Sequence, residues 1–98
     1  MMTLTIEQNV ATITKENIQN WLIEKVAEQL GIKITDISTN EELAAYGLDS
    51  MDAVMISGEL EEMLDLELPS TILWDYPTID SISTHLIELT NSEEISLI

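Results

Sequence analysis

The stretch Gly47-Leu48-Asp49-Ser50-Met51 stands where a loop turns into an acidic amphipathic helix. Gly47 suits a change of chain direction, and apolar residues then recur at helical spacing from Ser50 to Leu64. Ser50 is therefore predicted to begin a helix and to be exposed. This setting favours a covalent attachment point, because a helix N-terminus stabilises an anion. The acidic surface nearby can also bind a modifying enzyme of opposite charge.

The composition predicts one small acidic domain. The chain has 98 residues, 45% of them hydrophobic, and no phenylalanine, so its core must consist mainly of Leu, Ile, Val and Met. It carries 19 acidic and 3 basic residues, for a formal net charge of −16. That charge argues against nucleic acid and against anionic membranes as partners, since both need a basic face. It suits enzymes with basic surfaces.

The sequence favours a cytoplasmic location. The start, Met1-Met2-Thr3-Leu4-Thr5-Ile6-Glu7, lacks a basic region followed by a long apolar stretch, and no run is long enough to span a bilayer. The chain has no cysteine, so any thioester chemistry must use a thiol from elsewhere. No Asp-x-Asp-x-Asp-Gly pattern occurs, and no metal site is expected.

The domain is predicted to cover residues 14–90, with residues 1–13 as an N-terminal tail and residues 91–98 as a C-terminal tail. Thr14 is a suitable N-cap for a first helix that ends at Leu30, before Gly31. A long connection over residues 32–49 follows. In it, Asn40 to Leu43 is expected to form one helical turn, and four apolar residues are expected to hold it against the bundle: Ile34, Ile37, Leu43 and Leu48.

Three further elements complete the fold. A second helix runs from Ser50 to Leu64, and a short helix or turn over residues 71–75 is stopped by Tyr76-Pro77, because a residue before proline disfavours the helical conformation. Thr78 caps a last helix that runs to about Thr90. The fold class is therefore all-α: a small antiparallel bundle of three main helices plus one short helix, with a long first loop.

The second helix carries two apolar faces, although a surface helix needs only one. One face suits the core: Ala53, Ile56, Leu60, Met63 and Leu64. The nearly opposite face holds Met51, Val54, Met55 and Gly58, near several acids. We expect this second face to be an exposed patch for partner proteins, since methionine adapts to several surfaces. The alternative is that it packs beneath the long first loop.

Ser50 lacks what a catalytic serine needs. A serine hydrolase requires a base beside the hydroxyl and a third group to orient that base. The single histidine, His85, lies far along the chain, and the residues around Ser50 do not fit the nucleophile-elbow pattern. We expect His85 to be a solvated or half-buried helix residue.

Two blocks of the sequence form a recognisable pair: Tyr46-Gly47-Leu48-Asp49-Ser50-Met51 and Leu68-Pro69-Ser70-Thr71-Ile72-Leu73-Trp74-Asp75-Tyr76-Pro77-Thr78-Ile79. Together they resemble the acyl carrier protein family, and the second block is similar to the carrier domains of modular polyketide synthases. Weaker similarity extends from about Ile18 to about Leu89. The resemblance implies a carrier rather than an enzyme, with 4′-phosphopantetheine joined covalently to Ser50. It also implies that Asp49 helps to hold magnesium in the complex with the modifying transferase.

The resemblance further implies which partners the protein has. These are a phosphopantetheinyl transferase and the acyl-loading and condensing enzymes of a synthase for polyketides or mixed lipid–polyketide products. We expect a monomer. The partner-binding residues carried over from the family are Met51, Asp52, Val54, Met55, Glu61 and Glu62. Met55 and Gly58 depart from many fatty-acid carriers, in which an acidic and a larger apolar residue stand at these places.

Two other interpretations remain open from the sequence. A peptidyl or aryl carrier of a nonribosomal peptide synthetase usually shows Gly-Gly-(His/Asp)-Ser, whereas Leu48 stands at the place of the second glycine. A protein of a different class, an acidic helical adaptor that never carries a prosthetic group, would use the same acidic faces without any modification of Ser50.

Overall fold

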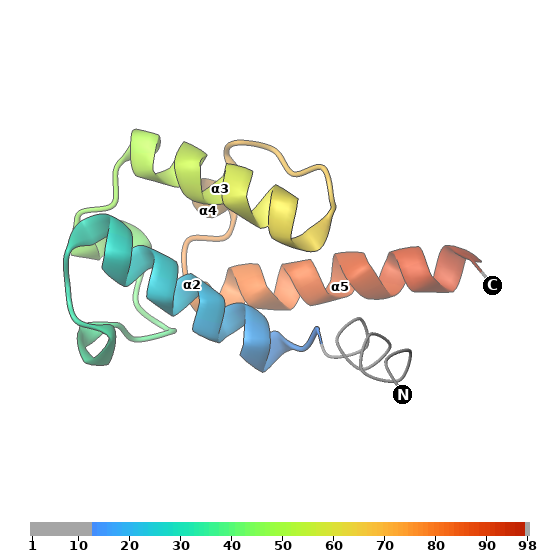
Figure 1. Ribbon diagram of the computed structural model, residues 1–98, viewed down its shortest axis with the longest axis horizontal. Helices are drawn as coiled ribbons and strands as arrows, with labels where there is room; N and C mark the ends of the chain where they lie inside the picture. The colour runs from blue at the N-terminus through green and yellow to red at the C-terminus, as the bar shows by residue number, and fades with distance from the viewer. Residues whose placement is uncertain (1–12, 98) are drawn as a thin grey trace, which may run out of the picture.

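The computed structural model describes residues 13–97, and it is helical as predicted (Figure 1). Its elements in chain order are α2 (Lys15–Leu30), the 3₁₀ turns η1 (Ile34–Asp36) and η2 (Leu43–Tyr46), α3 (Ser50–Leu64), α4 (Ile72–Asp75) and α5 (Ile79–Leu97). Helix α2 runs in the opposite direction to α3 and α5, and it packs against both. The expected N-terminal tail falls almost wholly outside the described residues.

The ends of α2 are set by the two residues that the sequence singled out. The Thr14 hydroxyl accepts a hydrogen bond from the Asn17 N–H at 3.1 Å, which satisfies one of the free donors of the first turn. Gly31 ends the helix in the left-handed conformation, at φ 69°, and its N–H donates to the Ala27 carbonyl oxygen. The buried face of the helix consists of Ile18, Leu22, Val26 and Ala27.

One apolar core joins the main helices. Helix α3 contributes Ala53, Ile56, Leu60 and Leu64, and α5 contributes Ile79, Ile82 and Leu86. Burying one such Leu or Ile side chain is worth about 1.5–3 kcal/mol, so this set is the main source of stability. Met63 differs from the prediction: it remains 37% exposed instead of joining the core.

The long first loop is anchored by fewer apolar side chains than expected, and backbone hydrogen bonds to the start of α5 attach it as well. Leu43 and Leu48 are buried and Ile37 is partly buried, but Ile34 is exposed. The expected helical turn at Asn40–Leu43 is wrong, because the turn is η2, which begins only at Leu43. The residues just before it bond to the start of α5 instead: Glu42 forms an isolated antiparallel bridge with Thr78, and the Thr39 carbonyl oxygen accepts from the Asp80 N–H.

The C-terminal half follows the predicted order with one difference in length. Helix α4 ends at Asp75, before Pro77, as the proline requires. The Thr78 hydroxyl accepts from the Ser81 N–H at 3.0 Å and so caps α5. The helix does not end near Thr90 but continues to Leu97, since residues 91–97 contain neither glycine nor proline to stop it.

Candidate functional site: the junction before α3

The chain is turned sharply just before α3. Gly47 has φ 94° and ψ 12°, a conformation that is strained for residues with a side chain. The following Leu48 is buried in the core and anchors the junction. Asp49 is extended and serves as the N-cap, so that Ser50 is the first helical residue, as predicted.

A reciprocal pair of hydrogen bonds fixes this start. Asp49 Oδ1 accepts from the Asp52 N–H at 2.9 Å, and Asp52 Oδ2 accepts from the Asp49 N–H at 3.2 Å. This is a capping box, with Asp52 in the place that Glu or Gln usually takes. Asp49 therefore has a structural role as a cap, and the magnesium role that the resemblance implies for it stays a prediction.

A third residue, which sequence reasoning missed, completes the junction. Gln29 Nε2, in the last turn of α2, donates to Asp52 Oδ1 at 2.8 Å. This bond is the main reason why the pKa of Asp52 lies below its ordinary value, and the bond from the Asp49 N–H is the second. Nothing in the sequence pattern marks Gln29, because its importance depends on how the end of α2 is placed against α3.

Ser50 is exposed, and among residues 13–90, whose side chains the structure describes, its hydroxyl has no hydrogen-bond partner. The N–H groups of Ser50 and Met51 lie at the first two positions of α3, where the helix itself supplies no acceptor. His85 lies elsewhere: its ring stacks on Tyr76, with the ring centroids 4.0 Å apart. The geometry thus offers an accessible hydroxyl beside free donors, and it does not join Ser50 and His85 into a nucleophile–base pair.

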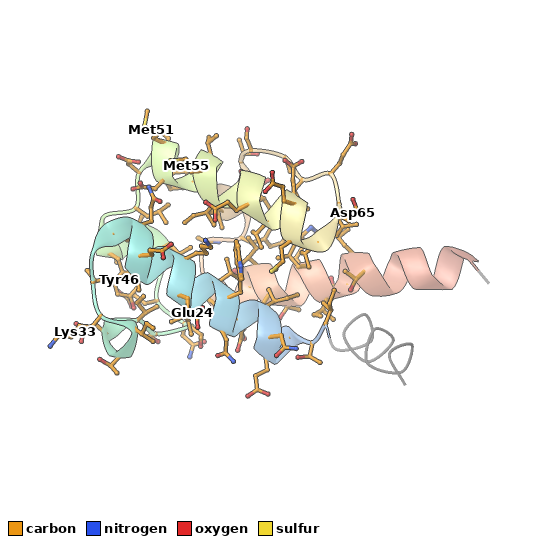
Figure 2. The ribbon with its side chains drawn as sticks, in the orientation of Figure 1. Glu24, Lys33, Tyr46, Met51, Met55 and Asp65 are labelled. Atoms are coloured by element: carbon orange, nitrogen blue, oxygen red, sulfur yellow. The ribbon has the colours of Figure 1, made fainter. Side chains whose placement is uncertain are left out.

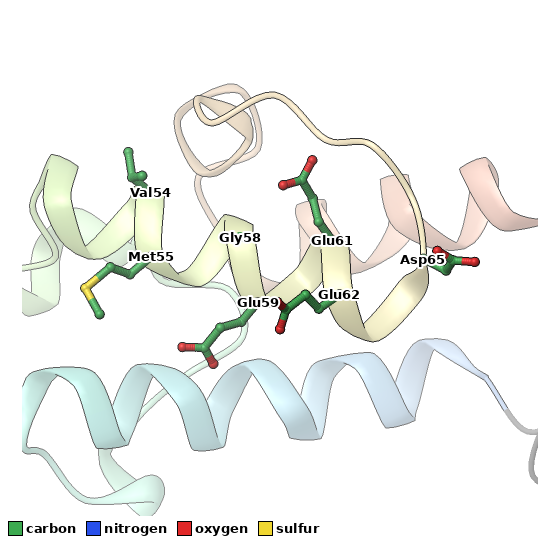
Figure 3. A pocket seen from close by; sticks show the side chains of 7 residues that line it. All are labelled: Val54, Met55, Gly58, Glu59, Glu61, Glu62 and Asp65. Carbon is green, nitrogen blue, oxygen red and sulfur yellow. The ribbon is translucent and has the colours of Figure 1, made fainter.

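The second apolar face of α3 is open to solvent. Met51, Val54 and Met55 are 71%, 51% and 48% exposed, so the alternative that they pack beneath the first loop is wrong. Figure 2 shows Met51 pointing away from the bundle at the start of α3. Farther along, a shallow hollow of about 610 Å³ is lined by Val54, Met55, Gly58, Glu59, Glu61, Glu62 and Asp65 (Figure 3).

The acidic side chains around this hollow differ in whether they form hydrogen bonds or ion pairs within the protein. Glu61 Oε2 accepts from the Leu68 N–H at 2.8 Å, so it ties α3 to the connection that follows. Glu59 pairs with Lys25 of α2 at 2.8 Å and raises the pKa of that lysine. Glu62 is exposed and forms no ion pair within the described part of the chain. Of the predicted acidic contacts on this helix, only Glu62 is therefore uncommitted, since Asp52 belongs to the capping box.

Two further findings concern the described residues alone. Among residues 13–90, whose side chains the structure describes, no group of three or more His, Cys, Asp or Glu side chains is arranged to hold a metal ion. None of the helices found there combines the length and the apolar character needed to cross a bilayer.

Comparison with known proteins defines the class. The family described as "Phosphopantetheine attachment site" matches residues 20–86, which include the α3 junction and most of the bundle. The chain therefore belongs to the family of phosphopantetheine-binding carrier domains. Members of this family hold their cargo on a covalently attached 4′-phosphopantetheine, and the chemistry is performed by other enzymes. They work with a phosphopantetheinyl transferase and, in synthases, with the enzymes of the synthase.

Individual relatives agree with this assignment. Over 68 residues, 68% of the chain, it is 34% identical to the non-reducing polyketide synthase terA of Aspergillus terreus, and it spans only 3% of that protein's length. Among solved structures, it resembles a free-standing peptidyl carrier protein of Acinetobacter baumannii with a TM-score of 0.75 and 34% identity, over 78% of this chain and 95% of that one. It is 43% identical to the acyl carrier protein LipD of Actinoplanes friuliensis, with a TM-score of 0.65, over 81% of this chain and 88% of that one.

Proposed function

We propose that this protein is an acyl carrier protein whose 4′-phosphopantetheine is attached to Ser50, and that it delivers acyl groups in polyketide or mixed lipid–polyketide synthesis. The observation that carries the proposal is the exposed Ser50 hydroxyl at the first position of α3, which has no hydrogen-bond partner among the described residues. It lies within the residues that match the carrier family. A modifying enzyme can approach this oxygen without any rearrangement of the fold.

The residues around Ser50 fit the group. Attachment joins the Ser50 oxygen to the phosphorus that bears the pantetheine arm of coenzyme A; the pyrophosphate bond breaks, the adenosine bisphosphate part leaves, and the hydroxyl proton is released. The negative charge of the resulting phosphodiester is favoured by the helix dipole and by the N–H groups of the first turn. Asp49 is already oriented by the capping box, with its carboxylate beside Ser50 in sequence. We assign it the family role of helping to hold magnesium in the transferase complex. When bound, the cofactor supplies the thiol that the cysteine-free chain lacks, and acyl groups are carried on that thiol as thioesters.

The patch on α3 is the proposed partner surface. It combines the exposed Met51, Val54 and Met55 with Asp52, Glu61 and Glu62. Flexible apolar side chains near acids suit several enzymes that share one basic docking face. The partners are the phosphopantetheinyl transferase and the acyl-loading and condensing enzymes. The protein acts as a monomer in the cytoplasm, where coenzyme A and such enzymes are available.

The polyketide assignment is supported by the curated relatives and by Leu48, which stands where peptidyl carriers usually have a second glycine. A peptidyl carrier role is the second candidate, and the likeness to the peptidyl carrier protein of Acinetobacter baumannii favours it. The two are separated by loading the modified protein. A polyketide acyltransferase with malonyl-coenzyme A should acylate it, whereas amino acid adenylation enzymes should not.

The central experiment is incubation with coenzyme A and a broad-specificity phosphopantetheinyl transferase, followed by intact-mass measurement. We expect one phosphopantetheine to be added to the wild type, and none to Ser50→Ala. Ser70→Ala is the matched control, since Ser70 is also an exposed serine but lies in the connection before α4; it should be modified like the wild type. An unmodified wild type would favour the adaptor class, and an adduct on Ser50→Ala would remove Ser50 as the site.

A further inference from the structure

Gln29 is a side chain of α2 that bonds to the first turn of α3. Its amide nitrogen lies 2.8 Å from Asp52 Oδ1 and 3.7 Å from Met55 Sδ. A single NH₂ group has two hydrogens, so one amide can serve both contacts. Through them, Gln29 touches a residue of the capping box and a residue of the exposed patch.

The bonds form a chain that ends at the modification site. Gln29 holds one oxygen of Asp52, and the other oxygen of the same carboxylate accepts the Asp49 N–H. Asp49 in turn accepts the Asp52 N–H and is followed directly by Ser50. Both carboxylate oxygens of Asp52 accept hydrogen bonds, and these bonds fix its rotamer. The start of α3 is therefore held in one geometry relative to α2.

The chemistry of the donor is as informative as its position. A lysine at position 29 could also bond to Asp52, but it would neutralise the carboxylate. The neutral amide of Gln29 orients Asp52 and leaves its negative charge in place. Nearby, the fold does use a lysine in this way, since Lys25 pairs with Glu59 one turn earlier on α2. Asp52 is thus kept both fixed and charged, which is what a basic enzyme surface can recognise.

We propose that Gln29 is a positioning residue for the modification of Ser50: by holding Asp52 it pre-orders the Asp49–Ser50 junction for the phosphopantetheinyl transferase. This inference rests on the proposed attachment at Ser50. Gln29 does not touch the reacting oxygen. Its effect is to raise the fraction of molecules whose junction is already in the form that the transferase binds, and that fraction scales the apparent affinity.

The test is steady-state kinetics of the transferase with the full-length apo protein as the varied substrate. Gln29→Met keeps the length of the side chain and removes the donor. We expect KM to rise about three- to tenfold, the range that the loss of one hydrogen bond spans, with kcat unchanged. Gln29→Glu should raise KM further, because a second carboxylate would repel Asp52. Amide exchange at Asp49 should become faster in both variants.

Gln19→Met is the matched control. Gln19 lies on the same helix, and its amide bonds to Asp80 at 3.4 Å and to Ser83 at 3.2 Å, away from Ser50. If Gln29 contributed only to general packing of α2, both variants would lower the melting temperature and neither would change KM selectively. We expect KM to respond to Gln29→Met alone.

A double-mutant cycle with Asp52→Ala locates the effect. Since Gln29 is proposed to act through Asp52, Gln29→Met should cause no further rise in KM in the Asp52→Ala background. The inference is overturned by an unchanged KM in Gln29→Met, by an equal rise in Gln19→Met, or by an effect that persists without Asp52. An unmodified wild type would instead refute attachment itself, so the two failures are distinguishable.

Discussion

The Leu43 N–H donates a hydrogen bond of 2.9 Å to the Pro77 carbonyl oxygen. This bond joins the first loop to the residue that precedes Thr78, the N-cap of α5. The Leu43 side chain is itself only 1% exposed. One residue therefore fixes the loop twice, through its backbone and through its burial. The junction before Ser50 follows only a few residues later, so its placement depends on this attachment.

Truncating the Leu43 side chain should destabilise the whole domain. Leu43→Ala leaves a cavity in the core, and such changes cost about 2–5 kcal/mol. Urea unfolding followed by circular dichroism measures this cost. Ile34→Ala is the control within the same loop, because Ile34 is exposed and changes at such surface positions stay within about 0.5 kcal/mol. Equal effects of the two changes would contradict the anchoring role of Leu43.

Two glycines should respond in opposite directions to the same substitution. Within the described part of the chain, an added Cβ meets nothing within 4 Å at either Gly47 or Gly58, so neither change causes a clash there. At Gly47, with φ 94°, the cost comes from the backbone alone, and Gly47→Ala should lower the free energy of unfolding by about 1–3 kcal/mol. Gly58 lies inside α3, where Gly58→Ala should raise it by about 0.5–1 kcal/mol. Denaturant titrations that show the same sign for both would refute this interpretation.

The acid titration of Asp52 should depend on Gln29. The pKa of Asp52 lies below its ordinary value of 3.8, first because of the Gln29 amide and then because of the Asp49 N–H. The unfolded chain therefore takes up this proton more readily than the folded one. The resulting stabilisation is present above pH 3.8 and is lost as the pH falls through the lower folded value. In Gln29→Met, the midpoint of the Asp52 carboxyl titration, followed by carbon-13 NMR, should move to higher pH. An unchanged midpoint would show that the Gln29 amide does not lower this pKa.

The α3 patch should be sensitive to charge in partner assays without being needed for folding. Met55→Glu places a carboxylate on the apolar part of the patch, and Glu62→Lys reverses an uncommitted acid, so both should slow acyl transfer by cognate enzymes several-fold. The melting temperature should stay close to that of the wild type. Glu24→Lys, on the exposed side of α2, makes the same charge change as Glu62→Lys elsewhere. Transfer rates that fall equally in Glu24→Lys would point to net charge instead of a local surface.

Much of the fold follows from local signals in the sequence. Thr14 and Gly31 mark the ends of α2 because capping is a matter of a few adjacent residues, and the proline at position 77 limits α4 for a similarly local reason. The start of α3 at Ser50 and its exposed second face also follow from the spacing of apolar residues. The same spacing accounts for the accessible positions of Met51 and Met55, because both lie on the face that the core does not need.

What the sequence could not supply depends on contacts between distant residues. The turn expected at Asn40 forms at Leu43 instead, since the preceding residues bond to the start of α5. Ile34 and Met63 look like core residues by type, but the way the elements pack leaves both of them exposed. Gln29 resembles any polar residue on a surface helix until α2 and α3 are brought together.

The hydrogen bond from the Leu68 N–H to Glu61 has a practical consequence for mapping the docking face. An alanine scan along this helix would register Glu61 as a contact residue even if no enzyme ever reached it, because losing its carboxylate releases the chain that leads to α4. Glu62, its immediate neighbour, makes no such hydrogen bond to any described residue, and the comparison of the two separates recognition by an enzyme from support of the scaffold.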